Sequence, residues 1–79
     1  MIIEMRFTQI GDIVEGKILE WKKKQQDEVT KGEALVEIDV GKVNEEFEAP
    51  ATGILTEIRA AEGSTVYAGD IIAIITTPD

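Results

Sequence analysis

Lys42 is the residue of this chain best suited to chemistry, because it stands in the turn-like segment Val40-Gly41-Lys42-Val43. An exposed lysine is either a solubilising charge or an amine to which another group can be attached. The chain contains no cysteine and no histidine, so it lacks a thiol, the commonest general base and the commonest metal ligand. Sulfur chemistry would therefore need an attached group. Because the sequence shows no paired nucleophile and base, an independent enzyme is not predicted.

Carboxylates crowd the sequence around this lysine, at Asp39, Glu45, Glu46 and Glu48. Calcium loops arrange their ligands around a glycine-hinged turn, whereas these residues follow the alternation of strands. We therefore expect a solvated strand face and no metal site. The negative charge of that face would steer the domain toward a basic surface on a partner protein.

Two strands are predicted to flank the lysine. Apolar residues alternate with Glu37 and Asp39 before it, and the alternation resumes after it through Val43 to Phe47. Gly41 stands first in a two-residue loop, where glycine tolerates the positive φ of a type II′ turn. Lys42 is therefore predicted at the exposed tip of a β-hairpin, with Val40 and Val43 paired.

The rest of the chain is interpreted as short strands separated by glycine-rich, proline-containing or polar turns. No segment shows an apolar period of 3.6 residues, so the fold class is predicted to be all-β. Pro50 ends the return strand of the hairpin. Trp21 and Phe47 are expected to pack in the core, with Phe47 facing Val36. The other expected strands are 1–8, 17–22, 28–30, 53–58, 65–67 and 70–76.

An internal repeat with an offset of 37 residues links Gly16 to Gly53. It predicts a sandwich of two similar four-strand halves related by a pseudo-twofold axis, in which each half supplies one apolar face. Gly32 and Gly69 would lie in equivalent tight turns. Further pairs at the same offset are Ile18 and Leu55, Trp21 and Ile58, Val29 and Val66, Leu35 and Ile72, and Ile38 and Ile75.

Length and charge limit the function classes. The chain has 79 residues, enough for one domain with a barely sufficient core. Sixteen acidic residues against eight basic ones give a net charge of −8, which disfavours nucleic acids and anionic membranes as partners. No apolar run has transmembrane length and no secretory leader is recognisable. We expect a cytoplasmic protein, or one of the mitochondrial matrix if a transit peptide was removed.

Four segments, in their order and spacing, resemble a lipoyl domain from the acyltransferase of a 2-oxo acid dehydrogenase complex. They are residues 11–21, 26–38, 48–55 and 62–70, and together they cover nearly the whole chain. In that family the modified lysine lies eight residues before the proline of an Ala-Pro pair, as Lys42 does before Pro50. Two positions differ from the family pattern, since Gly41 replaces the usual aspartate and Gln26 replaces a common glycine.

This resemblance implies a flattened β-barrel, or sandwich, of two four-stranded antiparallel sheets. It implies lipoate attached covalently to Lys42, with Gly41 and Val43 forming the turn around it. It also implies a carrier domain over residues 1–76, with a linker starting at 77–79. Residues expected to take part in partner recognition are Gly11, Asp12, Ile13, Val14, Glu15, Asp39 and Glu45.

The implied partners are a lipoate-attaching enzyme, a thiamine-diphosphate 2-oxo acid decarboxylase, an acyltransferase core and a dihydrolipoyl dehydrogenase, and the domain itself is expected to be monomeric. Three alternatives stay open. A biotinyl carrier has the same fold, but biotin sites flank their lysine with methionines, which Gly41 and Val43 do not match. An unmodified binding module would be favoured by Gly41. A glycine-cleavage carrier is normally longer.

Overall fold

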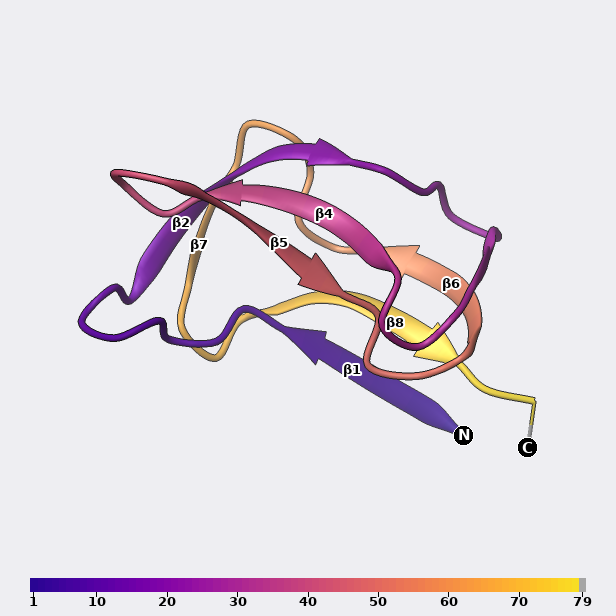
Figure 1. The fold of residues 1–79 in the computed structure, drawn as a ribbon. Coiled ribbons are helices and arrows are strands. Elements are labelled where there is room, and N and C mark those ends of the chain that lie inside the picture. The colour runs from indigo at the N-terminus through magenta and orange to yellow at the C-terminus, as the bar shows by residue number, and fades with distance from the viewer. Residues whose placement is uncertain (79) are drawn as a thin grey trace.

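The computed structural model describes residues 1–78, which form eight strands in two antiparallel four-stranded sheets and no helix (Figure 1). Among these residues there is consequently no helix that could cross a membrane. The predicted all-β class and the two-sheet architecture are confirmed. The first sheet has the order β1 (Ile2–Arg6), β8 (Ile71–Thr76), β6 (Gly53–Ile58) and β3 (Glu28–Val29). The second has the order β5 (Asn44–Glu48), β4 (Ala34–Asp39), β2 (Glu15–Trp21) and β7 (Thr65–Tyr67).

The predicted repeat reappears in the strands and in their irregularities. Adding 37 to the residue numbers of β4 gives the bounds of β8, and adding 37 to those of β3 gives the first two residues of β7. The bulge of β2 between Ile18 and Glu20 has its counterpart in β6 between Leu55 and Glu57. Such agreement in register shifts shows that the two halves share one local conformation as well as one pattern of apolar residues.

The turns before β4 and β8 are also equivalent. Thr30 donates its amide hydrogen to the Glu33 carboxylate over 3.0 Å, and Tyr67 donates to the Asp70 carboxylate over 2.8 Å. Gly32, between the first two residues, has a φ of 90°, close to the 96° of its counterpart Gly69. The pattern of a glycine followed by an acidic residue therefore encodes the same turn twice.

One sequence expectation about the halves is wrong. Neither half of the chain supplies one complete sheet, because the short strands exchange between sheets. β3 pairs with β6 of the second half, and β7 pairs with β2 of the first. The segment before β3 crosses to the opposite sheet, where the amide of Gln26 donates to the carbonyl of Leu55 over 2.6 Å. This exchange covers an edge of β2 and an edge of β6 that would otherwise be unpaired.

The core lies between the two sheets and is filled by the inward residues of the long strands. Trp21 and Phe47 are partly buried and pack against it. Phe47 stands opposite Val36, as predicted, and its ring stacks on Phe7 of the facing layer with 5.3 Å between ring centroids. The largest side chains that are fully buried are Phe7, Ile18, Leu35, Val36, Ile38, Leu55, Ile72 and Ile75.

Some strand ends differ from those expected. The first strand ends at Arg6 rather than Thr8, and the second begins at Glu15 rather than Lys17 because Glu15 pairs with Tyr67 of β7. Strand alternation does not reveal such a partner, since it defines a face and not a neighbour. The other changes are shifts of one or two residues.

The molecule is elongated, with extents of 37 × 19 × 19 Å. Figure 1 shows the hairpin formed by β4 and β5 at one end, while both chain termini lie at the other. The predicted linker at 77–79 falls at the terminal end, and its last residue, Asp79, lies outside the described residues. The fold therefore separates the hairpin tip from the ends of the chain along its longest dimension.

Candidate attachment site

The hairpin between β4 and β5 closes through a loop of two residues, Gly41 and Lys42. Asp39 is opposite Asn44 in the sheet, and the amide of Val40 donates to the carbonyl of Val43 over 3.1 Å. Gly41 has a φ of 116°, so the predicted positive φ and two-residue loop are present. This φ is wider than the roughly 60° of an ideal type II′ turn.

Lys42 is exposed, and among the described residues no ion pair holds its amine. Two other lysines are engaged. Lys22 lies 3.7 Å from carboxylates on Glu20 and Glu46, and Lys23 lies 3.4 Å from that of Glu33. The Lys42 side chain is therefore free to reach an electrophile presented by another protein.

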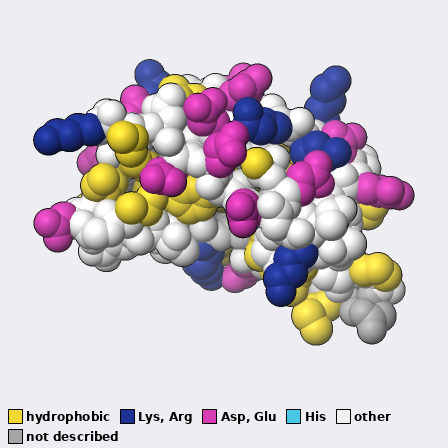
Figure 2. Space-filling model, in the orientation of Figure 1, with side chains coloured by type: hydrophobic (Ala, Val, Ile, Leu, Met, Phe, Trp, Pro, Cys, Tyr) yellow, Lys and Arg dark blue, Asp and Glu magenta, His cyan; other side chains and the backbone are white. Residues whose placement is uncertain are grey.

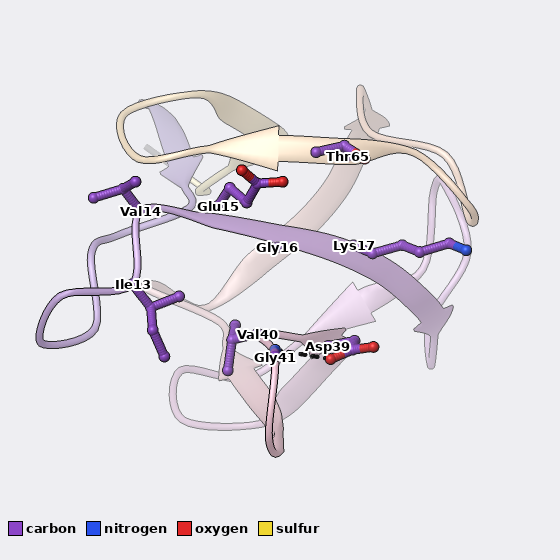
Figure 3. A pocket seen from close by; sticks show the side chains of 9 residues that line it. All are labelled: Ile13, Val14, Glu15, Gly16, Lys17, Asp39, Val40, Gly41 and Thr65. Carbon is purple, nitrogen blue, oxygen red and sulfur yellow. Dashed lines mark hydrogen bonds between the residues drawn. The ribbon is translucent and has the colours of Figure 1, made fainter.

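Asp39 makes a direct contact with the loop. Its Oδ1 atom accepts a hydrogen bond of 2.9 Å from the amide of Gly41, two residues further along the chain (Figure 3). A short carboxylate side chain commonly satisfies a loop amide in this way. The residue immediately before Lys42 is thus tied to the end of β4 by a side chain.

A groove of about 350 Å³ lies beside the hairpin and extends to the preceding segment of the chain. Its lining combines apolar and charged side chains, and Figure 3 shows them on three separate parts of the fold. Among the lining residues, Val40 has the most deeply buried apolar side chain. Thr65 lines the groove from β7. The lining residues are Ile13, Val14, Glu15, Gly16, Lys17, Asp39, Val40, Gly41 and Thr65.

The segment that reaches the groove is held by a tight turn. Ile10 and Ile13 exchange backbone hydrogen bonds of 2.8 and 3.0 Å, and Gly11 between them has a φ of 56°. The side chain of Gln9 donates to the carbonyl of Gly11 over 2.7 Å. Val14 follows this turn and is half exposed, next to the hairpin that carries the lysine.

The residues expected to serve partner recognition lie in three places. Ile13, Val14, Glu15 and Asp39 line the groove with Gly41, whereas Gly11 and Asp12 lie in the turn outside it. Glu45 is on the other strand of the hairpin, opposite Ile38 and partly buried, and is not part of the groove lining. Sequence reasoning did not include Lys17 and Thr65, which become neighbours through the pairing of β2 with β7.

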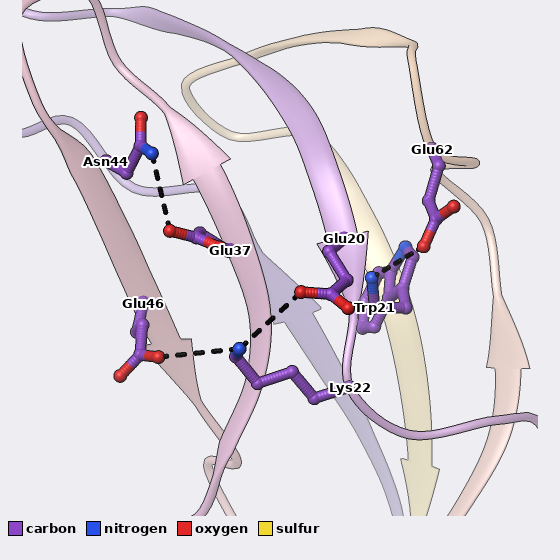
Figure 4. Close-up of polar contacts among 7 residues, drawn as sticks. All are labelled: Glu20, Trp21, Lys22, Glu37, Asn44, Glu46 and Glu62. Atoms are coloured by element: carbon purple, nitrogen blue, oxygen red, sulfur yellow. Dashed lines mark hydrogen bonds and ion pairs between the residues drawn. The ribbon is translucent and has the colours of Figure 1, made fainter.

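The outer face of the same sheet carries a network of charged groups (Figure 4). Lys22 bridges Glu20 and Glu46, which belong to different strands, and the amide of Asn44 donates to Glu37 over 3.3 Å. No group of acidic side chains in residues 1–78 is arranged to hold a metal ion. Glu20 and Glu46 lie in ion pairs with Lys22, and Glu37 accepts a hydrogen bond from Asn44.

The space-filling view in Figure 2 shows Asp and Glu side chains distributed over the visible face, with an apolar area toward the hairpin end. Three exposed or half-exposed apolar residues belong to that end, namely Val43 in the hairpin and Ile13 and Val14 beside the groove. An apolar area with acidic surroundings is typical of a protein-docking surface.

The comparisons with known proteins agree with this geometry. The sequence profile of the biotin/lipoyl family, described as "Biotin-requiring enzyme", matches residues 3–75. Over 73 residues, 91% of this chain, the sequence is 48% identical to the dihydrolipoyllysine-residue succinyltransferase component of the 2-oxoglutarate dehydrogenase complex of Staphylococcus saprophyticus. Over 75 residues, 94% of this chain, it is 37% identical to the acetyltransferase component of the pyruvate dehydrogenase complex of Acholeplasma laidlawii. The matches cover only 17% and 14% of those two proteins.

Solved structures give the same result for the fold. A lipoyl domain of the 2-oxoglutarate dehydrogenase complex of Azotobacter vinelandii superposes with a TM-score of 0.74 at 30% identity, covering 94% of this chain and 98% of that one. A multi-domain long-chain acyl-CoA carboxylase gives a TM-score of 0.82 over 99% of this chain and 7% of its own length, at 18% identity, which is a likeness of fold alone. The chain belongs to the biotin/lipoyl family, and within it is a lipoyl domain homologous to those of the acyltransferase components of 2-oxo acid dehydrogenase complexes.

Proposed function

We propose that Lys42 carries a lipoyl group in amide linkage and that the domain shuttles acyl groups and reducing equivalents between the active sites of a 2-oxo acid dehydrogenase complex. The observation that carries the proposal is the position of Lys42. It is exposed, it makes no ion pair with a described residue, and it occupies the two-residue tip of the hairpin.

The residues around Lys42 suit covalent attachment. The neutral amine of Lys42 attacks the carbonyl carbon of an enzyme-bound lipoyl adenylate, an amide bond forms, AMP leaves and the amine proton passes to solvent. Gly41 has no side chain to obstruct the approach, and even a Cβ there would meet nothing within 4 Å. When attached, lipoate supplies a disulfide that can accept an acyl group and two electrons, a chemistry for which the chain itself has no sulfhydryl group.

The shape of the domain supports a carrier role. Chain termini at one end and Lys42 at the other allow the domain to be tethered without blocking its lysine. A tether turns encounters with several enzymes into local events at high effective concentration. The proposed partners are a lipoate-attaching enzyme, a thiamine-diphosphate decarboxylase, an acyltransferase core and a dihydrolipoyl dehydrogenase, with no catalytic step by the domain itself.

The attachment is tested by intact-mass measurement. The purified domain is incubated with ATP, lipoate and a lipoate ligase, and in parallel with ATP, biotin and a biotin ligase. We expect a single lipoyl amide and no biotinyl product. A biotinyl product would replace the lipoyl assignment with the biotinyl alternative. No labelling, under conditions that label a standard lipoyl domain, would favour an unmodified binding module.

The carrier role is tested with the lipoylated domain and purified decarboxylases. Relatives belong to 2-oxoglutarate and pyruvate dehydrogenase complexes, so both decarboxylases are assayed with their own 2-oxo acids. We expect one of the two decarboxylases to acylate the domain with a much higher kcat/KM than the other. Because the domain carries a net charge of −8, we expect kcat/KM to fall as salt rises from low to physiological concentration. Acylation by neither decarboxylase would contradict the carrier role in these two kinds of complex.

A further inference from the structure

The loop that carries Lys42 has few restraints of its own. Gly41 has the widest conformational freedom of any residue type, and nothing lies within 4 Å of the position its Cβ would take. Val43 and Asn44 beyond the lysine are exposed. Without a further contact, the two loop residues would sample many conformations in solution.

Asp39 supplies such a contact. Its Oδ1 atom accepts the Gly41 amide hydrogen at 2.9 Å, which joins the end of β4 directly to the residue before the lysine. Asp39 itself is partly buried and is held in the sheet, where it pairs with Lys17 of β2 and Asn44 of β5.

We propose that Asp39 is a positioning residue for modification: its carboxylate holds the Gly41-Lys42 loop in the conformation that the lipoate-attaching enzyme recognises. This inference rests on the proposed function of Lys42. If the enzyme binds only the ordered loop, losing the contact lowers the fraction of domain molecules that it can bind. The apparent affinity of the enzyme for the domain then falls in proportion to that fraction. Loss of the contact should therefore raise KM while kcat stays nearly constant.

Asp39 could instead act only through its charge, by attracting the modifying enzyme. The two roles differ for Asp39→Asn, which keeps an oxygen acceptor at the same place and loses the charge. Positioning predicts that this variant behaves like the wild type, whereas attraction by charge predicts that it behaves like Asp39→Ala. Glu37→Ala is a matched control, because Glu37 is a carboxylate on the same strand that contacts Asn44 and not the loop.

The test combines ligase kinetics with amide hydrogen exchange of Gly41 measured by NMR. For Asp39→Ala we expect KM to rise roughly fivefold with kcat within about twofold, and exchange at Gly41 to accelerate by a similar factor. Asp39→Asn and Glu37→Ala should stay within about twofold of the wild type in both measurements. Thermal unfolding of each variant verifies that the sheet is intact.

Each outcome decides between the alternatives. Unchanged exchange at Gly41 in Asp39→Ala, or faster exchange with an unchanged KM, would overturn the positioning role. An Asp39→Asn variant as impaired as Asp39→Ala would assign the effect to charge. If the wild type is not lipoylated at all, the proposed function fails, and the exchange measurement still decides whether Asp39 orders the loop.

Discussion

The amide of Thr77 donates a hydrogen bond to the carbonyl oxygen of Met1 over 2.9 Å, so the two ends of the chain are paired. Val40 and Val43 form the same bond, 3.1 Å long, at the base of the lysine loop. Thr77 lies 37 residues after Val40, which is the offset of the repeat. The chain ends therefore occupy the place of a second loop, symmetric to the one that carries Lys42.

This relationship predicts that the chain can be permuted. A circular permutant joins Thr77 to Met1 through an Asn-Gly loop, in place of the last two residues, and opens the chain between Gly41 and Lys42. Because short hairpin loops of this type suit paired strands, we expect the same sheet content and a free energy of unfolding within about 2 kcal/mol of the wild type. Circular dichroism and urea denaturation check this. An unfolded permutant would contradict the equivalence of the two sites.

Gln26 is the one residue other than glycine with a positive φ among the described residues, at 79°, and its counterpart in the repeat is Gly63, at 89°. A left-handed conformation costs a residue with a Cβ about 1–2 kcal/mol. We expect Gln26→Gly to raise the free energy of unfolding by up to about 1 kcal/mol, after allowing for the greater entropy of glycine in the unfolded chain. Urea denaturation measures the difference.

The reciprocal variant is the control. Nothing lies within 4 Å of a Cβ placed on Gly63, so Gly63→Gln changes backbone conformation without a steric clash. It should lower the free energy of unfolding by about 1 kcal/mol. A stabilising Gly63→Gln, or a clearly destabilising Gln26→Gly, would show that backbone strain does not distinguish these two turns.

Gly16 and Gly53 are equivalent in the repeat but differ in what surrounds them. A Cβ on Gly53 would overlap the backbone carbonyl of Thr76, whereas one on Gly16 would lie 3.2 Å from the equivalent carbonyl of Asp39 and 2.7 Å from a side-chain methyl of Ile38. A methyl group can move more easily than a strand backbone. We expect Gly53→Ala to cost about 3 kcal/mol or more and Gly16→Ala about 1–2 kcal/mol, measured by denaturation. Equal costs, or the reverse order, would contradict this account of the packing.

The stability of the domain should depend on pH through Glu33. The amide hydrogen bond from Thr30 is the main cause that lowers the pKa of Glu33 below its ordinary 4.5, and Lys23, 3.4 Å away, lowers the pKa further. A lowered pKa in the folded state contributes stability above the ordinary pKa, and this contribution is lost as pH falls through the lowered value.

Glu33→Gln removes that contribution. We therefore expect the wild type to exceed Glu33→Gln in its urea midpoint at about pH 7, and the difference to shrink as pH falls below 4.5 and through the lowered pKa. Midpoints measured across this range check the sign. A difference that grew on acidification would contradict the assignment.

The hairpin was predictable because its signals are local. Alternation from Val36 to Val40 defines a strand, and glycine before Lys42 defines a turn that needs positive φ. The repeat was equally visible, since paired apolar residues and turn glycines recur at one offset. These features give the fold class, the core and the position of the lysine.

The pairing of the short strands was not predictable from the sequence. Glu28 and Val29 form only two residues of strand, and their partner in β6 is set by the path of the preceding loop. The groove depends on that exchange, because Thr65 reaches it through β7. The contact of Asp39 with Gly41 depends on a side-chain rotamer, which strand alternation does not define.

We propose that Lys42, and no other lysine, receives the lipoyl group. Lys22 and Lys23 are held by carboxylates and lie away from the hairpin tip. The direct test is peptide mapping by mass spectrometry of the wild type and Lys42→Arg after incubation with lipoate, ATP and ligase. We expect one modified peptide in the wild type, carrying Lys42, and no modification of a Lys42→Arg variant that unfolds at the wild-type temperature. Labelling that persists in Lys42→Arg, or that maps to residues 22–24, would contradict the account.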